Sequence, residues 1–427
     1  MKIVTQNPEK VKIKAKRLVA QMRKSLSIPQ CKFALEMVMG MMSTGSCNLT
    51  RIAASLHEPK ATRHTLKRLQ RMLRYEHILD VVNELSLREA KAKVSDETVL
   101  ALDDGDIVHL YGKKFENLAT VHDGSSGEQR RGYWLNQVSG YNASTQETFP
   151  LLLDMYSVKE PGYKSATAEA IGMIDRVTAV IGQKGVWVAD RLYDSSRVLA
   201  HMFKKGLRFL VRMDGDRHIM VRGRKMAMRE AAELVNRRVK YSDHARFGSM
   251  KAAVQLGYEQ YEMTLVVYKD KRNREPIMWM APGHVKSTVT LKRWIRGYFR
   301  RWGVEESYRF EKQGFGIEKA TVRRYGGIKT LLGLTLLSWL VLIRINDDGK
   351  LRREVSRAAK MEKEKRHQQP KFNYYRLLQG VKNILSGIRR LFLFRWKKRS
   401  KVASIKGQQP LLPMFSRLPL SLLELEY

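Results

Sequence analysis

Strand-like and helix-like segments alternate between residues 98 and 213, and this alternation constrains the fold more than any other feature. The apolar run Thr98–Leu102 precedes an amphipathic stretch from Ser165 to Gln183, and the apolar run Val186–Ala189 follows that stretch. A second amphipathic segment leads into the strand-like run Leu207–Met213. Strands that alternate with helices are typical of an α/β sheet, so we predict an α/β core.

Two of these predicted strands stop at acidic residues. The first is followed by Asp103, Asp104, Gly105 and Asp106, and the run Val186–Ala189 is followed by Asp190. A strand that presents a carboxylate at its end can build a metal site on a rigid element. A polar turn after a strand is the commoner explanation for a single case. The residues alone leave Asp103, Asp104 and Asp106 open as the first acid.

A later stretch, YFRRWGVEESYRFEK at 298–312, is predicted to be helical. At about 100° per residue, Tyr298, Arg301, Glu305 and Lys312 share a wedge roughly 60° wide, and Arg309 lies close to it. A carboxylate flanked by cations can hold a metal and a phosphodiester together. A charged stripe by itself is more often a solvated, salt-bridged helix face.

The net charge indicates the partner. Lys and Arg number 80 against 42 acidic residues, giving +38. Such an excess repels itself unless a polyanion neutralises it, so nucleic acid is the expected partner. With 43% hydrophobic residues the chain can bury a core, unlike a small packing protein of chromatin or the ribosome.

The cysteines and apolar runs indicate the compartment. The chain has 2 cysteines and no metal-ligand spacing among them, which fits a reducing cytosol. The N-terminus lacks a signal-peptide core, and the longest apolar run, Leu331–Ile343, is too short to span a bilayer and is predicted to be a buried helix. We therefore expect no membrane partner. The absence of a Walker-type glycine loop predicts no nucleotide cofactor.

The first 95 residues are predicted to be helical, with Asn48 as a helix cap and one long basic helix after Pro59. Two helices joined by a short turn fit either a helix-turn-helix or an ordinary helical bundle. The basic residues of the second helix favour phosphate contact, with Arg68 and Arg71 as candidate DNA-binding residues.

The alternation breaks over 214–290, where several strand-like runs predict an antiparallel insertion inside the α/β domain. Trp279 lies in its last strand and is expected to be a core residue. We predict five regions: helices that bind DNA ends (1–95), the first part of the core (96–213), the β-rich insertion (214–290), the second part of the core with the glutamate helix (291–349), and a basic helical C-terminal region (350–427).

With these residues in view, the chain resembles the DDE transposases of bacterial insertion sequences, in the group named for a Tyr-Arg-Glu-Lys signature. Tyr298, Arg301, Glu305 and Lys312 match the signature spacing position for position. The stretches LALDDGDI and VWVADRLYDSS are similar to the two aspartate segments of that family. One departure is Gly105, where members often have Thr.

The resemblance implies a ribonuclease H-like catalytic core with Asp103, Asp190 and Glu305 as catalytic and metal-binding residues. It also implies that Tyr298, Arg301 and Lys312 grip phosphates, and that Trp279 stacks on a flipped base if a DNA hairpin forms. Oxygen ligands favour Mg²⁺, with Mn²⁺ as a substitute. A homodimer on paired DNA ends, in the bacterial cytoplasm at the nucleoid, is the implied assembly.

The function predicted from the sequence is therefore cut-and-paste transposition, with binding of terminal inverted repeats, cleavage, and joining of 3′-hydroxyls to target DNA. Two alternatives remain: a metal-dependent nuclease without strand transfer, and a non-catalytic, domesticated DNA-binding protein. The first would use the same three acids but give no joined product, whereas the second would not need the acids at all.

Overall fold

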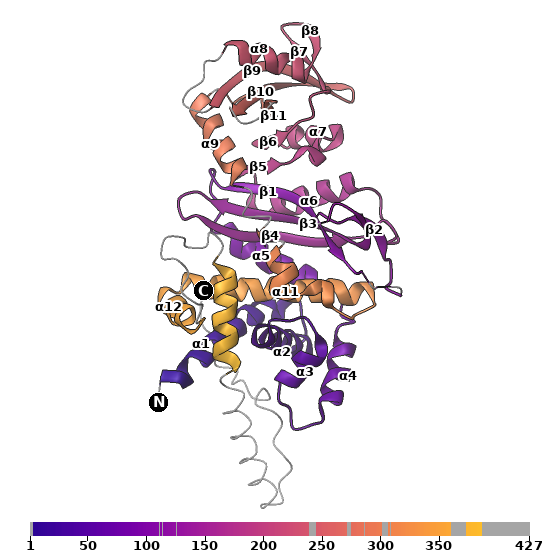
Figure 1. Ribbon diagram of the computed structural model, residues 1–427, viewed down its shortest axis with the longest axis vertical. Coiled ribbons are helices and arrows are strands. Elements are labelled where there is room, and N and C mark those ends of the chain that lie inside the picture. The colour runs from indigo at the N-terminus through magenta and orange to yellow at the C-terminus, as the bar shows by residue number, and fades with distance from the viewer. Residues whose placement is uncertain are drawn as a thin grey trace, which may run out of the picture. The chain divides into compact units, whose positions relative to one another are not determined.

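The computed structural model describes residues 3–110, 112, 114–124, 126–238, 245–270, 275–285, 287–300, 306–307, 309–359 and 373–386 (Figure 1). The chain forms two compact units. The first comprises Met1–Ser86, Ile107–Tyr133 and Ser307–Tyr427, and the second comprises Leu87–Asp106 and Trp134–Glu306. Each unit therefore combines segments that are distant in the sequence.

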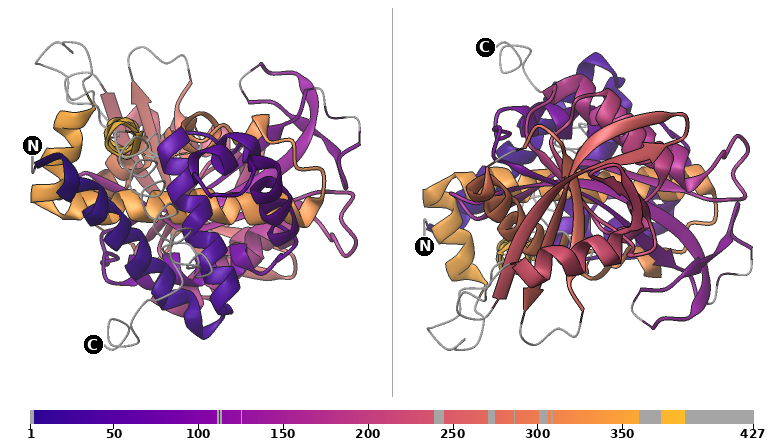
Figure 2. Two further views of the ribbon diagram at one scale, coloured as in Figure 1. Left: turned by 90° about the horizontal axis from the view of Figure 1, so that it is seen from below. Right: turned by 90° about the horizontal axis from the view of Figure 1, so that it is seen from above.

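The first unit is mainly helical. Its principal elements are α1 (Ile3–Gln21), α2 (Ile28–Thr44), α3 (Leu49–Ser55), α4 (Thr62–Met72), most of α5 (Ile78–Lys91), α11 (Tyr325–Asp347) and α12 (Gly349–Ala358). The indigo helices α1 and α2 lie against the orange α11 (Figure 2). Short strand β2 (Ala119–His122) pairs antiparallel with the start of β3 (Gln129–Asn142).

Local signals set the end of α2 and the start of α3, and the predicted cap at Asn48 is confirmed. Gly45 ends α2 with φ of 62°, a left-handed conformation that glycine adopts readily. The side chain of Asn48 accepts hydrogen bonds from the backbone N–H groups of Thr50 and Arg51, which caps α3. The predicted helical character of residues 1–95 is thus confirmed over the part of this region that the structure describes.

The basic helix predicted after Pro59 is divided into α4 and α5, so the prediction of one continuous helix is wrong. The break exposes the backbone carbonyl of Tyr75, which accepts a hydrogen bond from the hydroxyl of Thr330 in α11 at 3.0 Å. The start of α5 then packs closely on α11, where a Cβ on Gly333 would lie 2.8 Å from Cα of Leu79. Tertiary packing therefore sets this break, because the segment has no proline or glycine of its own.

The predicted buried helix is α11, which extends beyond the apolar run at both ends. With 23 residues it is long and apolar enough to cross a membrane, but 89% of its most apolar window is buried inside the structure. Its neighbours α1, α2 and α12 cover it within its own unit. This burial identifies α11 as a core helix.

The second unit contains a mixed sheet. Its first part runs in the order β4 (Glu147–Tyr156), β3, β1 (Val99–Val108), β5 (Val186–Ala189) and β6 (Phe209–Arg212). Strands β1, β5 and β6 are parallel, whereas β3 and β4 are antiparallel. Helices α6 (Ala166–Ile181) and α7 (Ser196–Lys204) lie in the connections. The predicted α/β alternation is confirmed here.

The same sheet continues beyond β6 with antiparallel strands in the order β11 (Ile277–Pro282), β10 (Glu259–Asp270), β9 (Ala245–Leu256), β7 (His218–Val221) and β8 (Arg224–Ala227). Helix α8 (Met228–Arg238) packs on them. The hairpin β7–β8 was not predicted, because its two strands have only 4 residues each, too few for a clear alternation of polar and apolar residues.

Helix α9 (Thr288–Phe299) follows β11 and belongs to the second unit. The predicted helix over 290–313 is present up to Phe299, and residues 301–305 and 308 lie outside the described residues. The segment Phe310–Gly314 is a π-helical turn in the first unit. The constant 100° spacing assumed for this stretch therefore does not extend to Lys312.

Candidate active site

Strands β1 and β5 bring the two predicted aspartates together. They pair in parallel with Val99 opposite Val186 and Ala101 opposite Val188. Continued for two residues beyond the last paired positions, the same register would set Asp103 beside Asp190. Adjacent strands lie about 4.8 Å apart, so the two acids occupy neighbouring positions at one sheet edge.

The alternation of β1 separates its acids between the two faces of the sheet. Side chains two residues apart point to the same face, so Asp103 shares a face with Val99. Val99 contacts α9, where a Cβ built on Gly297 would lie 2.5 Å from Cγ2 of Val99. Asp103 therefore lies on the α9 face. Asp104, one residue later, lies on the opposite face.

The second acid is held at the end of β5 by its own backbone. The carboxylate of Asp190 accepts a hydrogen bond from the N–H of Leu192 at 2.8 Å and so caps the short 3-10 turn η2 (Arg191–Tyr193). An aspartate at this capping position satisfies a donor that the turn cannot satisfy internally. Asp190 is half-buried, so part of its carboxylate faces solvent.

On the opposite face, η2 is joined to β1. The buried Tyr193 donates a hydrogen bond from its hydroxyl to Oδ1 of Asp104 at 2.8 Å. Burial raises the pKa of Asp104 to about 6; the hydrogen bond from Tyr193 opposes the shift and the nearby charge of Asp190 adds to it. The charge of Asp104 also contributes to the raised pKa of Tyr156 on β4, after burial.

A second contact holds the segment after Asp190. The side chain of Asp194 is 8% exposed and accepts a hydrogen bond from Nε of Arg217 at 2.6 Å. Arg217 also donates to the backbone carbonyl of Asp194 at 3.1 Å. Residues 190–194 are thus tied to β1 through Tyr193 and to the segment before β7 through Arg217.

The third predicted acid, Glu305, and the predicted phosphate-binding Arg301 lie outside the described residues. The helix that precedes them, α9, is on the same face as Asp103. Within the described part of the chain, no group of three His, Cys, Asp or Glu side chains is arranged to hold a metal. The convergence of all three acids stays a prediction.

Tyr298 and Trp279 pack together in the second unit. Their rings meet edge to face with centroids 5.3 Å apart, and Phe299 also contacts Trp279. Trp279 is 0% exposed and Tyr298 7%. In this arrangement Trp279 is a core residue, as expected from the residues alone, and its ring has no surface on which a base could stack. The role implied by the resemblance stays a prediction.

Lys312 and Arg309 lie in the first unit. Nζ of Lys312 is 3.7 Å from Oε1 of Glu318, and the same oxygen accepts a hydrogen bond from the N–H of Val108 at 3.2 Å. Lys312 is half-buried, whereas Arg309 is exposed. Arg71 is also exposed, on α4, whereas Arg68 is ion-paired with Glu36 and Glu58.

A family model described as a transposase DDE domain matches residues 95–341, more than half of the 427 residues. The chain belongs to the DDE transposases. Both aspartates placed side by side above fall within the matched span. The predicted family is therefore confirmed at this level.

Solved structures give weaker similarities. The cryo-EM structure of the piggyBac transposase synaptic complex with hairpin DNA is similar with a TM-score of 0.47 and 11% identity, covering 95% of this chain and 84% of that one. Endonuclease V from Bacillus subtilis gives a TM-score of 0.23 and 11% identity, covering 49% of this chain and 79% of that one. No curated protein matches the sequence.

The donor set of this transposase fits a hard divalent cation. Carboxylate oxygens are the ligands that Mg²⁺ and Mn²⁺ prefer, and Asp103 within β1 and Asp190 after β5 would supply them. Burial is the main cause of the raised pKa of Asp104, and the charge of Asp190 adds to it, so these two carboxylates repel each other. A bound cation would relieve this repulsion.

Two residues that shape the site were not predicted. Tyr193 is 89 positions from Asp104 in the chain, and Arg217 is 23 positions from Asp194. The sequence does contain a signal for the first, because a tyrosine three residues after a strand-end aspartate can return toward the neighbouring strand through one tight turn. Nothing in the local sequence identifies the partner of Arg217.

Proposed function

We propose that this transposase cuts and pastes DNA: it binds terminal inverted repeats, hydrolyses the DNA at the element's ends, and joins the 3′-hydroxyls to target DNA. The observation that carries the proposal is the parallel pairing of β1 with β5 within the matched DDE domain, since its register, continued for two residues, would bring Asp103 beside Asp190. The +38 charge supports a polyanionic substrate.

The proposed catalytic core is ribonuclease H-like. The strand order β4–β3–β1–β5–β6, with the first two strands antiparallel and the last three parallel, supports it. The antiparallel strands β7–β11, which interrupt the chain between β6 and α9, would be the β-rich insertion. The spacing of Tyr298, Arg301, Glu305 and Lys312 supports membership of the Tyr-Arg-Glu-Lys group.

In the proposed mechanism, Asp103, Asp190 and Glu305 supply the oxygen ligands for two divalent ions. Such a pair, when bound, activates the attacking oxygen and stabilises the leaving oxygen in an in-line phosphoryl transfer. The chain's own residues position the reaction. The capping bond of Asp190 fixes the direction of its carboxylate, and Arg301 and Lys312 neutralise non-bridging phosphate oxygens.

The proposed partners follow from this reaction. Each element end needs one active site, so two copies of the chain would act on paired ends, in the bacterial cytoplasm at the nucleoid. A nuclease without strand transfer would use the same acids, and a non-catalytic DNA-binding protein would use none of them. Products therefore discriminate the three functions, whereas binding alone does not.

The test uses a labelled duplex that carries the terminal sequence of the element encoding this chain. The full-length protein is incubated with this duplex and a supercoiled plasmid, with and without Mg²⁺, and nicked, hairpin and joined products are resolved on gels. Joined product that requires Mg²⁺ supports the proposal. Cleavage without joining indicates the nuclease, and binding without cleavage in Mg²⁺ or Mn²⁺ indicates the non-catalytic protein.

A further inference from the structure

The α3–α4 pair in the first unit presents a basic face that the catalytic site does not use. Helix α4 contains no acidic residue, and a connection of six residues, 56–61, joins it to α3. The exposed residues of α4 and of the turn that follows it include four cations and one amide: Arg63, Lys67, Gln70, Arg71 and Arg74. At about 100° per residue these five fall within roughly 100° of one another, so they form one face. We refer to them as the α4 face.

The opposite side of α4 is inside the unit. Thr65 is 2% exposed and Leu69 is 0% exposed. No large apolar side chain of α4 is exposed. A helix that lies on a membrane surface needs an outward apolar stripe, which α4 lacks because its apolar residues point inward. A polyanion is therefore the ligand class that the α4 face suits.

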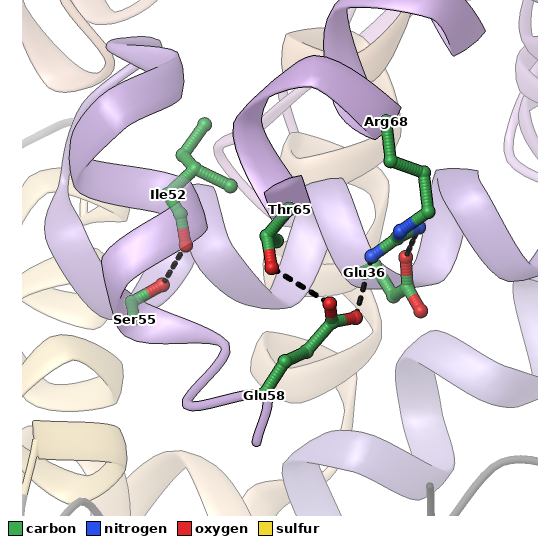
Figure 3. Close-up of polar contacts among 6 residues, drawn as sticks. All are labelled: Glu36, Ile52, Ser55, Glu58, Thr65 and Arg68. Carbon is green, nitrogen blue, oxygen red and sulfur yellow. Dashed lines mark hydrogen bonds and ion pairs between the residues drawn. The ribbon is translucent and has the colours of Figure 1, made fainter. Parts of the chain in front are cut away.

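Arg68 lies on α4 but does not belong to the α4 face (Figure 3). Its two terminal nitrogens each contact a carboxylate at 2.6 Å, one on Glu36 of α2 and one on Glu58 in the connection. Glu58 also accepts a hydrogen bond from the hydroxyl of Thr65 at 2.7 Å. The side chain of Glu36 is 4% exposed, and burial raises its pKa while Arg68 acts in the opposite direction.

This network joins three segments at one guanidinium. Because Arg68 is held by a carboxylate from α2 and another from the connection, the rotation of α4 about its own axis is fixed. That rotation decides which residues point outward. Arg68 therefore orients the helix, whereas the exposed cations of the α4 face are available to a ligand.

We propose that α4 enters the major groove of duplex DNA at the element's end, that Gln70 and Arg71 contact base edges, and that Arg68 is a positioning residue that does not touch DNA. The inference rests on the proposed function and specifies how it selects its DNA. A helix fits the major groove, which is about 12 Å wide. Arginine pairs with guanine and glutamine with adenine through two hydrogen bonds each, whereas Arg63, Lys67 and Arg74 supply phosphate contacts.

The test measures anisotropy of two labelled duplexes with the full-length protein, one carrying the terminal sequence and one a scrambled version, across a salt series. Arg71→Ala and Gln70→Ala should each weaken binding to the terminal duplex about 5- to 100-fold and the scrambled duplex much less. Lys67→Ala should weaken both duplexes alike and reduce the salt slope by about one. Arg353→Ala, an exposed arginine on α12, is the matched control for loss of one charge.

The role of Arg68 is tested by comparing Arg68→Gln alone with a double variant in which Glu36 is also replaced by glutamine. Arg68→Gln alone leaves Glu36 buried without its partner and should lower the melting temperature together with binding to both duplexes. Combining Arg68→Gln with Glu36→Gln removes the buried charge, so stability and the ratio of terminal to scrambled binding should both recover. A double variant that folds but loses terminal binding about as much as Arg71→Ala would show that Arg68 contacts DNA and would overturn this assignment.

The outcomes separate the inference from the proposed function. If the terminal duplex is preferred and Arg71→Ala and Gln70→Ala leave that preference unchanged, α4 does not read the ends, while the proposed function stands. If the wild-type protein shows no preference for the terminal duplex at any salt concentration, both the end-binding part of the proposed function and the inference fail.

Discussion

The hydroxyl of Tyr193 donates a hydrogen bond to Oδ1 of Asp104 across 2.8 Å, which joins the turn after β5 to the middle of β1. Asp103 is the residue before Asp104, and Asp190 begins the turn that Tyr193 ends, three residues earlier in the chain. The bond therefore fixes the relative position of the two proposed metal ligands without taking part in ligation. Loss of this hydrogen bond should therefore both destabilise this part of the sheet and change the position of Asp190 relative to Asp103.

Tyr193→Phe should reduce cleavage by up to about 10- to 100-fold, the usual effect of losing a group that orients a metal ligand, because Tyr193 holds the turn after Asp190 against β1. The buried carboxylate of Asp104 loses its donor, which should cost about 1–3 kcal/mol of unfolding free energy. Cleavage assayed over a Mg²⁺ titration should show a higher Mg²⁺ requirement. Tyr258→Phe removes a hydroxyl from a fully exposed tyrosine and serves as the control. An unchanged Mg²⁺ requirement in Tyr193→Phe would contradict the positioning role.

Asp103→Asn and Asp190→Asn should each lower cleavage by more than about a hundredfold, because a direct ligand matters more than the groups that orient it. The fold should survive at position 190, since asparagine caps a helical turn about as well as aspartate. Binding of the terminal duplex should stay within about twofold of wild type. Asp80→Asn, on the exposed surface of α5, is the control. Cleavage that persists in Asp190→Asn would remove the metal-site assignment.

His109 should make the first unit sensitive to acid. Burial lowers the pKa of His109 to about 4, partly opposed by a backbone hydrogen bond with Glu318. The unfolded chain takes up this proton near pH 6.5, whereas the folded chain does so only near pH 4. Stability is therefore full above about pH 6.5 and is lost as the pH falls toward 4, by about 2 kcal/mol at pH 5.

The measurement is the free energy of unfolding in urea at pH 7.5 and at pH 5, for wild type and for His109→Phe. The variant keeps a flat ring against Phe115, on which His109 stacks with centroids 4.5 Å apart. The loss of stability between the two pH values should be about 2 kcal/mol smaller in the variant. An equal loss in both proteins would show that other groups cause the acid sensitivity.

Two glycines inside helices should respond oppositely to alanine. Gly333→Ala in α11 places a methyl group 2.8 Å from the backbone of Leu79, so it should destabilise the protein by about 1–3 kcal/mol. Gly172→Ala in α6 meets nothing within 4 Å and should stabilise it by about 0.5–1 kcal/mol. Thermal melts of both variants check the signs. A neutral Gly333→Ala would mean that α5 can move away from α11.

The α/β core and the end of β5 before Asp190 could be predicted from the sequence, because an apolar run and the acid that follows it are local features. The predicted end of the first strand at Asp103 is wrong, because β1 continues through the acids to Val108. The break between α4 and α5 could not be predicted, since the hydroxyl that accommodates it comes from Thr330, 255 residues away from Tyr75. The ion pairs of Arg68 could not be predicted for the same reason, because Glu36 and Glu58 lie in other segments of the chain. Arg63, Lys67, Arg68 and Arg71 look alike in the sequence of α4 until Glu36 and Glu58 distinguish Arg68 from the others.

The contact between Gly297 and Val99 has a consequence for how variation in this chain affects activity. A methyl group at position 297 would lie 2.5 Å from Cγ2 of Val99, so either the valine side chain or the helix would have to shift. Val99 is on the same strand and the same face as Asp103, so a shift between α9 and β1 at this point would move the face that carries a proposed metal ligand. Substitution of Gly297 in natural copies should therefore lower activity even where the proposed acids are unchanged.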